Sequence, residues 1–363
     1  MTDRRRGRTI LIAPDSFKGS LTSVEVARAL GEGWRRARPA DTILLSPLAD
    51  GGEGTLAAVE AAGGWAWRRS TVHDPLGRPI EARWLWREVD GTGLAFIEMA
   101  TASGLSLVRA EERDPMTATS IGTGELIAAA IDHGASRITL GIGGSATTDG
   151  GRGLLAGLLA SDGRLDDIEL EVACDVSNPL LGPTGAAAIF GPQKGATPMQ
   201  VRQLDDRNAR WADELEAREG RRERHTPGAG AAGGGGFALL SIQDRFRRFA
   251  LRPGIELVME LTDFDPKLAQ SDLVITGEGR IDAQTAFGKT ALGVAQRART
   301  AGTPCIAVGG GVEPEGIEAL GALGVAVVPV VERPQTVEEA MAAGTAPVER
   351  CAERIGRLVG IVD

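Results

Sequence analysis

Short apolar segments that each run into a loop of glycine and acidic residues are the feature that most constrains this fold. Residues 9–13, 42–46 and 273–276 have the length and composition of buried strands, and a helical pattern follows each loop. Strands that alternate with helices form parallel sheets whose two faces are covered by those helices. Residues 305–308 and 325–330 add two further strands of the same kind. The two ends of the chain therefore predict one parallel α/β domain.

The middle of the chain predicts a second α/β domain, inserted into the first. Residues 71–87 place a Pro-Leu-Gly-Arg-Pro turn between β-rich arms, which is the pattern of a hairpin. Residues 228–236, rich in glycine and alanine, predict either a flexible linker or a loop that approaches a ligand closely. We expect residues 1–70 and 265–363 to form a flavodoxin- or Rossmann-like domain and residues 71–264 to form the inserted one. Further strand candidates in the insert are residues 94–98, 138–141, 169–174 and 187–190.

Composition excludes several classes of protein. A net charge of −9 argues against nucleic-acid binding, which normally needs a basic surface. No apolar run approaches the ~20 residues of a membrane-spanning helix, and the first apolar stretch is too short for a signal peptide. The three cysteines and three histidines lack the spacing of a disulfide framework or a zinc site. We therefore expect a soluble, cytoplasmic protein.

Lysine is scarce in this chain, and its few positions are informative. Of the 40 basic residues, only Lys18, Lys194, Lys267 and Lys289 are lysines. A lysine is a compact point charge and an arginine is a wide planar fork, so a tight pocket for a phosphate or carboxylate can require lysine. Three of the four lie in glycine-rich segments, and we interpret Lys267 as an ordinary surface residue. The other three are candidates for anion binding.

Three loops that follow predicted strands carry acidic and basic side chains. Ligands of parallel sheets bind at the carboxyl ends of the strands, so these loops should lie at one edge of the first domain. Helix capping explains the polar residues of any single loop, but three such loops together favour a site. The side chains concerned are Asp15, Ser16 and Lys18, then Asp50 and Glu53, then Glu278, Arg280 and Asp282.

A glycine-rich segment in the insert suits the binding of an anion. Residues 141–151 follow a predicted strand and lead into a helix, where backbone N–H groups can face a phosphate. The segment is not a dinucleotide fingerprint, because Ala146 occupies the final glycine position of that pattern. Residues 283–290 have an alanine in place of the first P-loop glycine, so we treat that match as accidental, although Lys289 stays a candidate for a phosphate contact.

The insert offers further polar side chains after its predicted strands. Asp175 and Asn178 lie in a loop that contains proline, and Lys194 lies in a loop that contains glycine. We expect Asp175 and Lys194 to reach a ligand. Residues 119–125 we interpret as a helix cap in preference to a substrate contact.

Taken in order along the chain, these segments resemble the bacterial glycerate kinase family. The resemblance implies two dissimilar α/β domains, one of them flavodoxin-like, with the active site between them. It also implies transfer of the ATP γ-phosphoryl group to glycerate, with 2-phosphoglycerate as the product, in glyoxylate and glycerate metabolism. The matching segments are residues 13–20, 49–55, 141–147, 173–180, 190–196, 227–234, 252–256 and 275–282.

Roles for the candidate residues follow from what phosphoryl transfer requires, which is phosphate donors, carboxylates for Mg²⁺, a base and a cation. The catalytic candidates are Asp15 or Asp175 as the base, with Lys18 and Arg280 as cations at the glycerate carboxylate or the transferring group. Ser16, Asp50, Asn178 and Lys194 are the candidates for substrate binding. The candidates for nucleotide binding are Gly143, Gly144, Ser145, Gly277, Glu278 and Lys289, and those for Mg²⁺ are Asp50, Glu278 and Asp282. We expect ATP and glycerate as small-molecule partners, no nucleic acid and no membrane, and we leave a homodimer open.

One region departs from the family pattern. Residues 151–168 are shorter than the family normally has, and Thr148 stands where an asparagine is expected. The shortening keeps one alternative open, namely a non-catalytic protein that binds sugar acids. A second alternative, independent of the shortening, is a kinase or phosphatase for another small hydroxy acid. The choice between the 2- and 3-hydroxyl group of glycerate rests on the resemblance alone.

Overall fold

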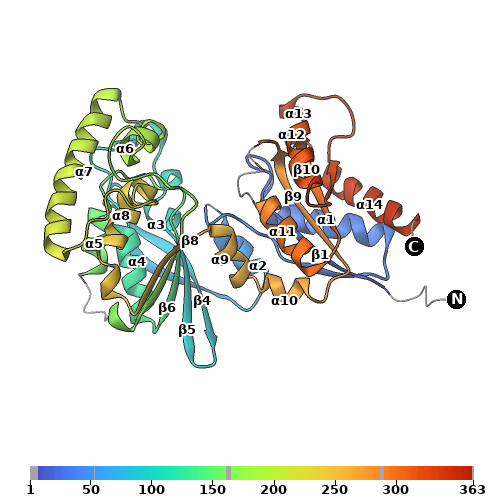
Figure 1. Cartoon of the computed structure of the whole chain (residues 1–363), viewed down its shortest axis with the longest axis horizontal. Helices are drawn as coiled ribbons and strands as arrows, with labels where there is room; N and C mark the ends of the chain where they lie inside the picture. Colours follow the sequence, from blue (N-terminus) through green and yellow to red (C-terminus); the bar gives the residue numbers. More distant parts are fainter. Residues whose placement is uncertain (1–6, 53, 161–164, 284, 286–289, 362–363) are drawn as a thin grey trace. The chain divides into compact units, whose positions relative to one another are not determined.

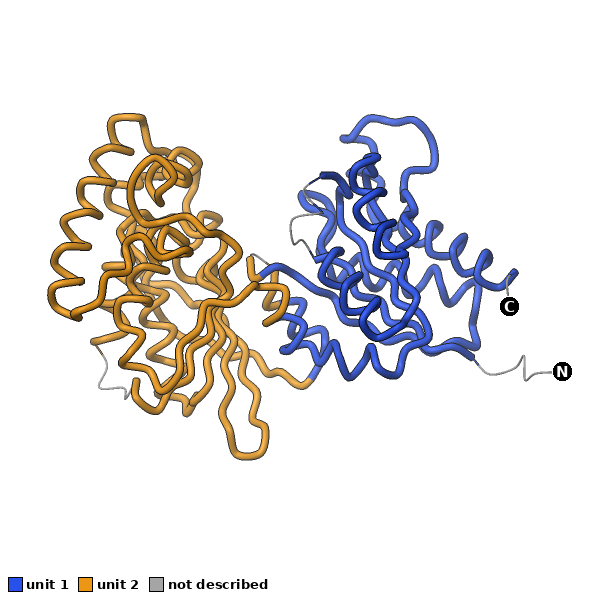
Figure 2. The backbone as a smooth tube through the Cα atoms, in the orientation of Figure 1, with its two compact units in different colours: residues 1–50, 57–63, 258–363 blue, residues 51–56, 64–257 orange. Residues whose placement is uncertain are grey.

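Two compact units make up the chain, as the computed structural model shows (Figure 1, Figure 2). The structure describes residues 7–52, 54–160, 165–283, 285 and 290–361. Unit 1 comprises residues 1–50, 57–63 and 258–363, and unit 2 comprises residues 51–56 and 64–257. The boundary expected after residue 70 falls inside strand β3 (Ala66–His73) of unit 2. Of the described helices, none combines the length and the apolar character of a membrane span.

Unit 1 is built on a five-stranded parallel sheet with the order β11-β10-β9-β1-β2. Counted along the chain, this order is that of a flavodoxin-like doubly wound sheet, so the predicted fold class is confirmed. The strands are β1 (Thr9–Pro14), β2 (Thr42–Leu45), β9 (Leu273–Ile281), β10 (Cys305–Val312) and β11 (Ala326–Pro329). The helices are α1 (Ser23–Ala37), α10 (Phe264–Leu268), α11 (Thr290–Ala301), α12 (Pro314–Gly321), α13 (Val337–Ala342) and α14 (Ala346–Ile361).

Strand β9 runs further than the sequence predicts. The strand was expected to end at Thr276, with a glycine-containing loop from 277 to 282, but its ladder with β10 continues to Ile281. Glycines on both strands explain the extension, because a Cβ built at Gly277 would lie 2.4 Å from the carbonyl oxygen of Val308. A Cβ at Gly310 would lie 2.5 Å from the carbonyl oxygen of Gly279. The missing side chains let the two backbones stay close enough to pair.

Unit 2 contains a six-stranded mixed sheet with the order β3-β4-β5-β6-β7-β8. Strands β3 to β5 are antiparallel, and β5 to β8 are parallel. Besides β3, the strands are β4 (Pro79–Val89), β5 (Thr92–Glu98), β6 (Arg137–Gly141), β7 (Glu169–Ala173) and β8 (Arg248–Arg252). The helices are α3 (Ala100–Ser103), α4 (Ile121–Asp132), α5 (Arg152–Leu158), α6 (Ala186–Phe190), α7 (Pro198–Glu219) and α8 (Gly235–Ser241). Helices α2 (Thr55–Ala61) and α9 (Gly254–Leu261) each contain residues of both units.

One prediction about unit 2 is wrong, and one strand was not predicted. Residues 187–190, expected as a strand, belong to helix α6, where three consecutive alanines favour the helix and Ala187 packs against Leu204 of α7. Strand β8 was missed, because its Arg-Phe-Ala-Leu-Arg sequence at the end of the sheet has no continuous apolar run.

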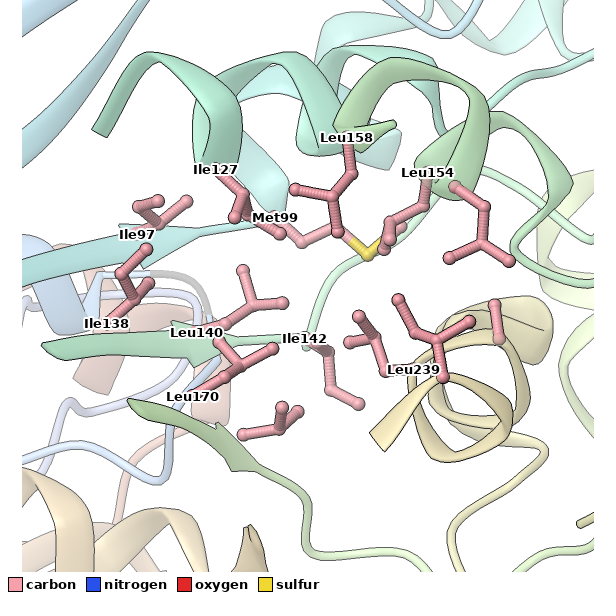
Figure 3. Close-up of a cluster of buried hydrophobic side chains, with 14 of the residues drawn as sticks. Ile97, Met99, Ile127, Ile138, Leu140, Ile142, Leu154, Leu158, Leu170 and Leu239 are labelled. Carbon is pink, nitrogen blue, oxygen red and sulfur yellow. The ribbon is translucent and has the colours of Figure 1, made fainter. Parts of the chain in front are cut away.

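The core of unit 2 lies between its parallel strands and the helices that cover them (Figure 3). Ile97, Leu140 and Leu170 project from β5, β6 and β7 and are fully buried. They meet Ile127 of α4 and Leu154 of α5. This packing fixes the carboxyl ends of three strands, from which the loops of interest leave.

The segment 228–236 is not an exposed, flexible linker. It continues into helix α8, and most of its residues are buried. A Cβ built at Gly233 would lie 1.9 Å from the carbonyl oxygen of Thr147, and Gly233 itself has φ +67°. The glycine is therefore required both by its backbone conformation and by the approach of residues 147–150.

We predict that Gly233→Ala destabilises unit 2 by clearly more than Gly220→Ala. Both glycines have positive φ, but no atom lies within 4 Å of a Cβ built at Gly220. Gly220→Ala therefore isolates the backbone cost of about 1–2 kcal/mol, and Gly233→Ala adds a clash with the carbonyl group. Urea unfolding followed by circular dichroism measures the difference. Equal losses in the two variants would contradict the close approach.

Candidate functional site

The switch point of the unit 1 sheet lies between β1 and β9. From β1 the chain continues to β2 on one side, and β9 pairs on the other side, with Pro14 opposite Gly277. Loops that leave neighbouring strands in opposite directions open a crevice at the carboxyl edge, where such sheets bind ligands. Asp15 follows β1 directly, and its N–H group donates to the carbonyl oxygen of Gly277 at 2.8 Å. The first candidate residue thus stands at the position where a ligand is expected.

Asp15 is a half-buried carboxylate with two hydrogen-bond donors. Thr290 Oγ1 donates to Asp15 Oδ2 at 2.5 Å, and the Ser16 N–H group donates to Oδ1 at 2.6 Å. Burial raises the pKa of Asp15 above its ordinary value, and the nearby negative charge of Asp50 raises it further. The bonds from Thr290 and Ser16 act in the opposite direction. The result is a carboxylate of increased basicity at the sheet edge.

The loop after Asp15 lies against β9. A Cβ built at Gly279 would lie 3.1 Å from the backbone nitrogen of Lys18, so the two segments are in close contact. The Lys18 side chain is exposed and has no hydrogen-bond or ion-pair partner among the residues that the structure describes. A lysine in this state can bind an anion without giving up an existing ion pair.

The acidic residues at the end of β9 and directly after it are already hydrogen-bonded to neighbouring residues. Glu278 is 6% exposed, and its Oε1 accepts a hydrogen bond from Thr285 Oγ1 at 2.6 Å. The N–H group of Asp282 donates to the same hydroxyl at 3.1 Å. Arg280 is exposed and forms ion pairs with Glu313 and, at 3.5 Å, with Asp282. These bonds fix the end of β9 at the crevice.

The acidic side chains suit Mg²⁺ in charge but do not form a complete metal cage. In the described part of the chain, no three His, Cys, Asp or Glu side chains gather closely enough to hold a metal ion. Mg²⁺ is usually bound through one or two carboxylates together with substrate phosphates, so a complete cage is not required. The mutual repulsion of Asp15 and Asp50 is the observation that fits, because a bound cation would relieve it.

In unit 2 the carboxyl ends of four parallel strands form a row. Glu98, Gly141, Ala173 and Arg252 are register neighbours on β5 to β8. The glycine-rich loop follows β6. A Cβ built at Gly141 would lie 2.5 Å from the carbonyl oxygen of Gly51. A glycine is thus required at position 141, because two backbone segments of unit 2 are in contact there.

The same constraint applies to the next glycine of the loop. A Cβ at Gly143 would lie 2.7 Å from the Cα atom of Gly52. Gly144 has φ +72°, a conformation that favours glycine. Ser145 forms an isolated bridge with Gly104. The predicted phosphate loop therefore has a defined conformation.

Lys194 is buried against the glycine-rich loop. It is 2% exposed, and its Nζ atom donates to Ser145 Oγ at 2.9 Å and to the carbonyl oxygen of Thr147 at 2.6 Å. Burial lowers the pKa of Lys194 to about 7, although the negative charge of Asp149 acts in the opposite direction. The structure therefore brings together Lys194 and Ser145, which the sequence placed in separate candidate sets.

Asp149 is a residue that the sequence interpretation missed. Its carboxylate accepts bonds from the Ser120 side chain and N–H group and from the N–H groups of Gly151 and Gly153. Ser120 Oγ in turn accepts from the N–H group of Leu154. The side chains of Asp149 and Ser120 therefore accept hydrogen bonds from the backbone N–H groups at the start of α5. Asp149 lies two residues before Gly151, the N-cap residue of α5, and thus outside the usual capping position, so the capping signals of the sequence did not indicate this role.

The remaining predicted residues have the following positions. Asp175 is exposed, and its Oδ1 accepts from the N–H group of Gly254, the first residue of α9, at 2.9 Å. Asn178 Nδ2 donates to the carbonyl oxygen of Thr184 at 2.8 Å, and this hydrogen bond stabilises the turn between the two residues. Lys267, expected at the surface, is half-buried, and its Nζ donates to the carbonyl oxygen of Thr262 at 2.8 Å. Glu53 and Lys289 lie outside the described residues.

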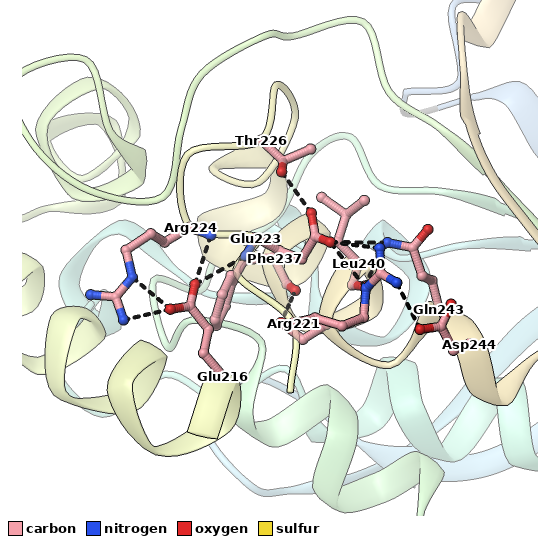
Figure 4. Close-up of polar contacts among 10 residues, drawn as sticks. Glu216, Arg221, Glu223, Arg224, Thr226, Phe237, Leu240, Gln243 and Asp244 are labelled. Carbon is pink, nitrogen blue, oxygen red and sulfur yellow. Dashed lines mark hydrogen bonds and ion pairs between the residues drawn. The ribbon is translucent and has the colours of Figure 1, made fainter. Parts of the chain in front are cut away.

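A polar network centred on Glu223 holds the segment that precedes residues 228–236 (Figure 4). Glu223, 8% exposed, accepts bonds from Arg221, Thr226 and Gln243. Residues 228–236 are joined to the loop after β7, since the Gly230 N–H group donates to the carbonyl oxygen of Asn178. The sequence analysis did not single out Glu223, and one of its partners, Gln243, lies 20 positions away along the chain.

We predict that Thr290→Val raises the pKa of Asp15 further. The substitution keeps the shape of the side chain and removes a hydrogen bond that lowers this pKa. NMR titration of the Asp15 carboxyl carbon measures the change. Thr276→Val is the matched control, since the Thr276 hydroxyl donates to the carbonyl oxygen of Ala13. An unchanged Asp15 titration in Thr290→Val would show that the bond has no effect on the carboxylate.

Comparisons with known proteins, by sequence and by structure, find the same family of proteins. The profile of the Glycerate kinase family matches residues 10–161 and 158–360. A glycerate kinase of Halalkalibacterium halodurans is 42% identical, over 96% of this chain and 97% of the relative. Escherichia coli K12 glycerate 2-kinase is 40% identical, over 83% of this chain and 84% of the relative. A crystal structure of a Salmonella typhimurium LT2 protein assigned as glycerate kinase 2 matches with a TM-score of 0.84 and 39% identity, covering 98% of this chain and 99% of that one.

The alignments also bear on the region expected to be short. The Halalkalibacterium alignment extends over 376 positions, more than the 363 residues of this chain, so the relative has residues without a counterpart here. The two family matches meet at residues 158–161, inside the 151–168 region.

Proposed function

The chain belongs to the glycerate kinase family, and we propose that it transfers the γ-phosphoryl group of ATP to the 2-hydroxyl group of glycerate, giving 2-phosphoglycerate and ADP. The observation that carries the proposal is the carboxylate at the switch point, where Asp15 has a raised pKa beside Asp50. The similarity to Escherichia coli glycerate 2-kinase supports the choice of acceptor and of product. We also propose that the protein acts in the cytoplasm on glycerate formed in glyoxylate metabolism.

In unit 1, we assign to Asp15 the role of the general base that accepts the proton of the glycerate hydroxyl group. A base works best when its pKa approaches the operating pH, which is the direction in which burial shifts Asp15. Asp175 of unit 2 is the second candidate for this role. Its contact with Gly254 explains its position as a helix cap, so we prefer Asp15.

The charges of the reaction require cations and a metal. We assign Lys18, which has no partner among the described residues, to the glycerate carboxylate or the transferring group, and Ser16 to substrate binding. Arg280 would have to exchange its ion pairs to act in the same way. We propose Asp50 as the main Mg²⁺ ligand, with Glu278 and Asp282 in support. Bound Mg²⁺ neutralises the negative charge of the phosphate oxygens.

The glycine-rich loop of unit 2 we assign to the phosphates of ATP. Backbone N–H groups of Gly143, Gly144 and Ser145 are the donors, and Gly277 with Glu278 in unit 1 is the second phosphate-binding segment. Asn178 is proposed to contact glycerate. Its amide already holds the turn at Thr184, so this contact would use its carbonyl oxygen.

Replacing Asp15 by Asn tests the assignment of the base. We expect turnover to fall about a hundredfold or more, because the amide cannot accept the proton, while the KM for glycerate changes little. A coupled assay of ADP release measures both constants. Asp265→Asn is the control, since Asp265 forms an exposed ion pair with Arg297 in the same unit. Normal turnover in a folded Asp15→Asn variant would transfer the role to another residue.

Phosphorus NMR of the product tests the reaction itself. We expect 2-phosphoglycerate after incubation with D-glycerate and MgATP. A 3-phosphoglycerate spectrum would retain the kinase and change its regiochemistry. Turnover of tartronate, lactate or erythronate in place of glycerate would indicate another hydroxy-acid kinase. Binding of glycerate without ADP release would favour the non-catalytic alternative that the shortened 151–168 region keeps open.

A further inference from the structure

A buried ammonium group without a neighbouring carboxylate stands behind the glycine-rich loop of unit 2. The two acceptors of Lys194 Nζ are a hydroxyl oxygen and a carbonyl oxygen, and in the described part of the chain no carboxylate lies within ion-pair distance. Burying a charge without a counter-charge is costly. A leucine or methionine would fill the same space at lower cost, so the ammonium group needs an explanation beyond packing.

The charged groups around Lys194 do not supply that explanation. Asp149 attracts the ammonium group from a distance, but its carboxylate is committed to Ser120 and the start of α5. Arg113 and Asp114 line the same small hollow as Lys194, together with apolar side chains such as Leu105. The Asp114 carboxylate accepts bonds from residues 116 and 117 of its own turn. The direct polar contacts of Lys194 are therefore those with the loop.

The loop is held from both sides at the residues that Lys194 contacts. Ser145 pairs with Gly104 on one side, while its hydroxyl group accepts from Lys194. The carbonyl group of Thr147 lies against Gly233 and accepts from the same ammonium group. Lys194 is thus a single side chain that ties two points of the loop together, two residues apart.

We propose that Lys194 is a positioning residue for phosphoryl transfer, which fixes Ser145 and Thr147 so that the loop presents its backbone N–H groups to the nucleotide phosphates. This role rests on the proposed kinase function. It differs from the direct substrate contact expected from the sequence, because two of the three N–H donors of Lys194 are taken by the loop. It also explains why lysine is kept here in a chain of arginines, since the compact ammonium group fits a position that is 2% exposed.

The protonation state of Lys194 adds a dependence on pH. Burial lowers the pKa of Lys194 to about 7. Below that pH the group carries a positive charge and three N–H donors, and above it the charge and one donor are lost. We therefore expect the apparent affinity for MgATP to decrease as the pH rises through about 7. Asp149 is the charged group that raises the pKa of Lys194 against the effect of burial, and Arg113 and Asp114 are the other charged residues that line its hollow.

Lys194→Met tests the role, with Lys267→Met as the matched control. Lys267 is half-buried, donates to backbone carbonyl groups and has a pKa lowered by burial. It belongs to no proposed site. We expect Lys194→Met to raise the KM for MgATP about tenfold or more while kcat at saturation changes less than about threefold. The variant should also lose the pH dependence of KM that the wild type shows, with ATP's own titration common to both. Lys267→Met should change neither property.

Ser145→Ala keeps the test valid if Lys194→Met folds poorly. It removes one of the two acceptors, so we expect a smaller rise in KM. Because both substitutions break the same bond, the double variant should show less than the product of the two effects. Independent, fully multiplied effects would overturn the proposed coupling.

Hydrogen exchange of the peptide containing residues 143–149 separates the failure of this role from the failure of the kinase function. We expect faster exchange in Lys194→Met than in the wild type and in Lys267→Met. Faster exchange with an unchanged KM for MgATP would overturn the role in catalysis. Unchanged exchange would overturn the fixing of the loop. A wild-type protein that releases no ADP with glycerate would overturn the proposed function, and the positioning role with it.

Discussion

Close approach of backbone to backbone at glycine residues is the constraint on which both units depend. Gly141 and Gly143 lie against residues 51 and 52, and Gly233 lies against Thr147, at distances that leave no room for a Cβ atom. In unit 1, a Cβ built at Gly279 would lie 3.1 Å from the backbone nitrogen of Lys18, which is a tight but less severe approach. The glycine-rich motifs therefore bring together segments distant in sequence, and the polar side chains between them acquire their partners as a consequence.

Those polar side chains are mostly fixed by other protein groups. Glu278 accepts from Thr285, Lys194 donates to Ser145, and Asp149 holds the start of α5. A group held in this way loses little conformational entropy when a ligand binds, which is the general advantage of a preorganised site. Lys18 is different, because it is exposed and has no partner among the described residues. The unit 1 edge thus combines fixed acids with an available cation.

Sequence patterns predicted well what depends on local order. The five strands of unit 1, the hairpin at 71–87 and the loop after β6 were all expected from apolar runs and turn residues. Patterns failed where a tertiary contact decided the outcome. Gly277 to Ile281 continue β9 because the facing strand also has glycines, and residues 187–190 form a helix packed on α7. Strand β8 is stabilised by its pairing with β7, which its own residues do not reveal.

By itself, the sequence determined the alternation of strands and helices, the family resemblance and the set of acids and lysines available for chemistry, because these depend on residue type and order along the chain. The tertiary structure decided what each of these groups does. Lys194 and Ser145 are 49 positions apart, and Thr290 and Asp15 are 275 apart, so no local pattern links them. Hydrogen bonds and burial set the pKa of Asp15 and of Lys194, and both depend on neighbours that only the folded chain supplies.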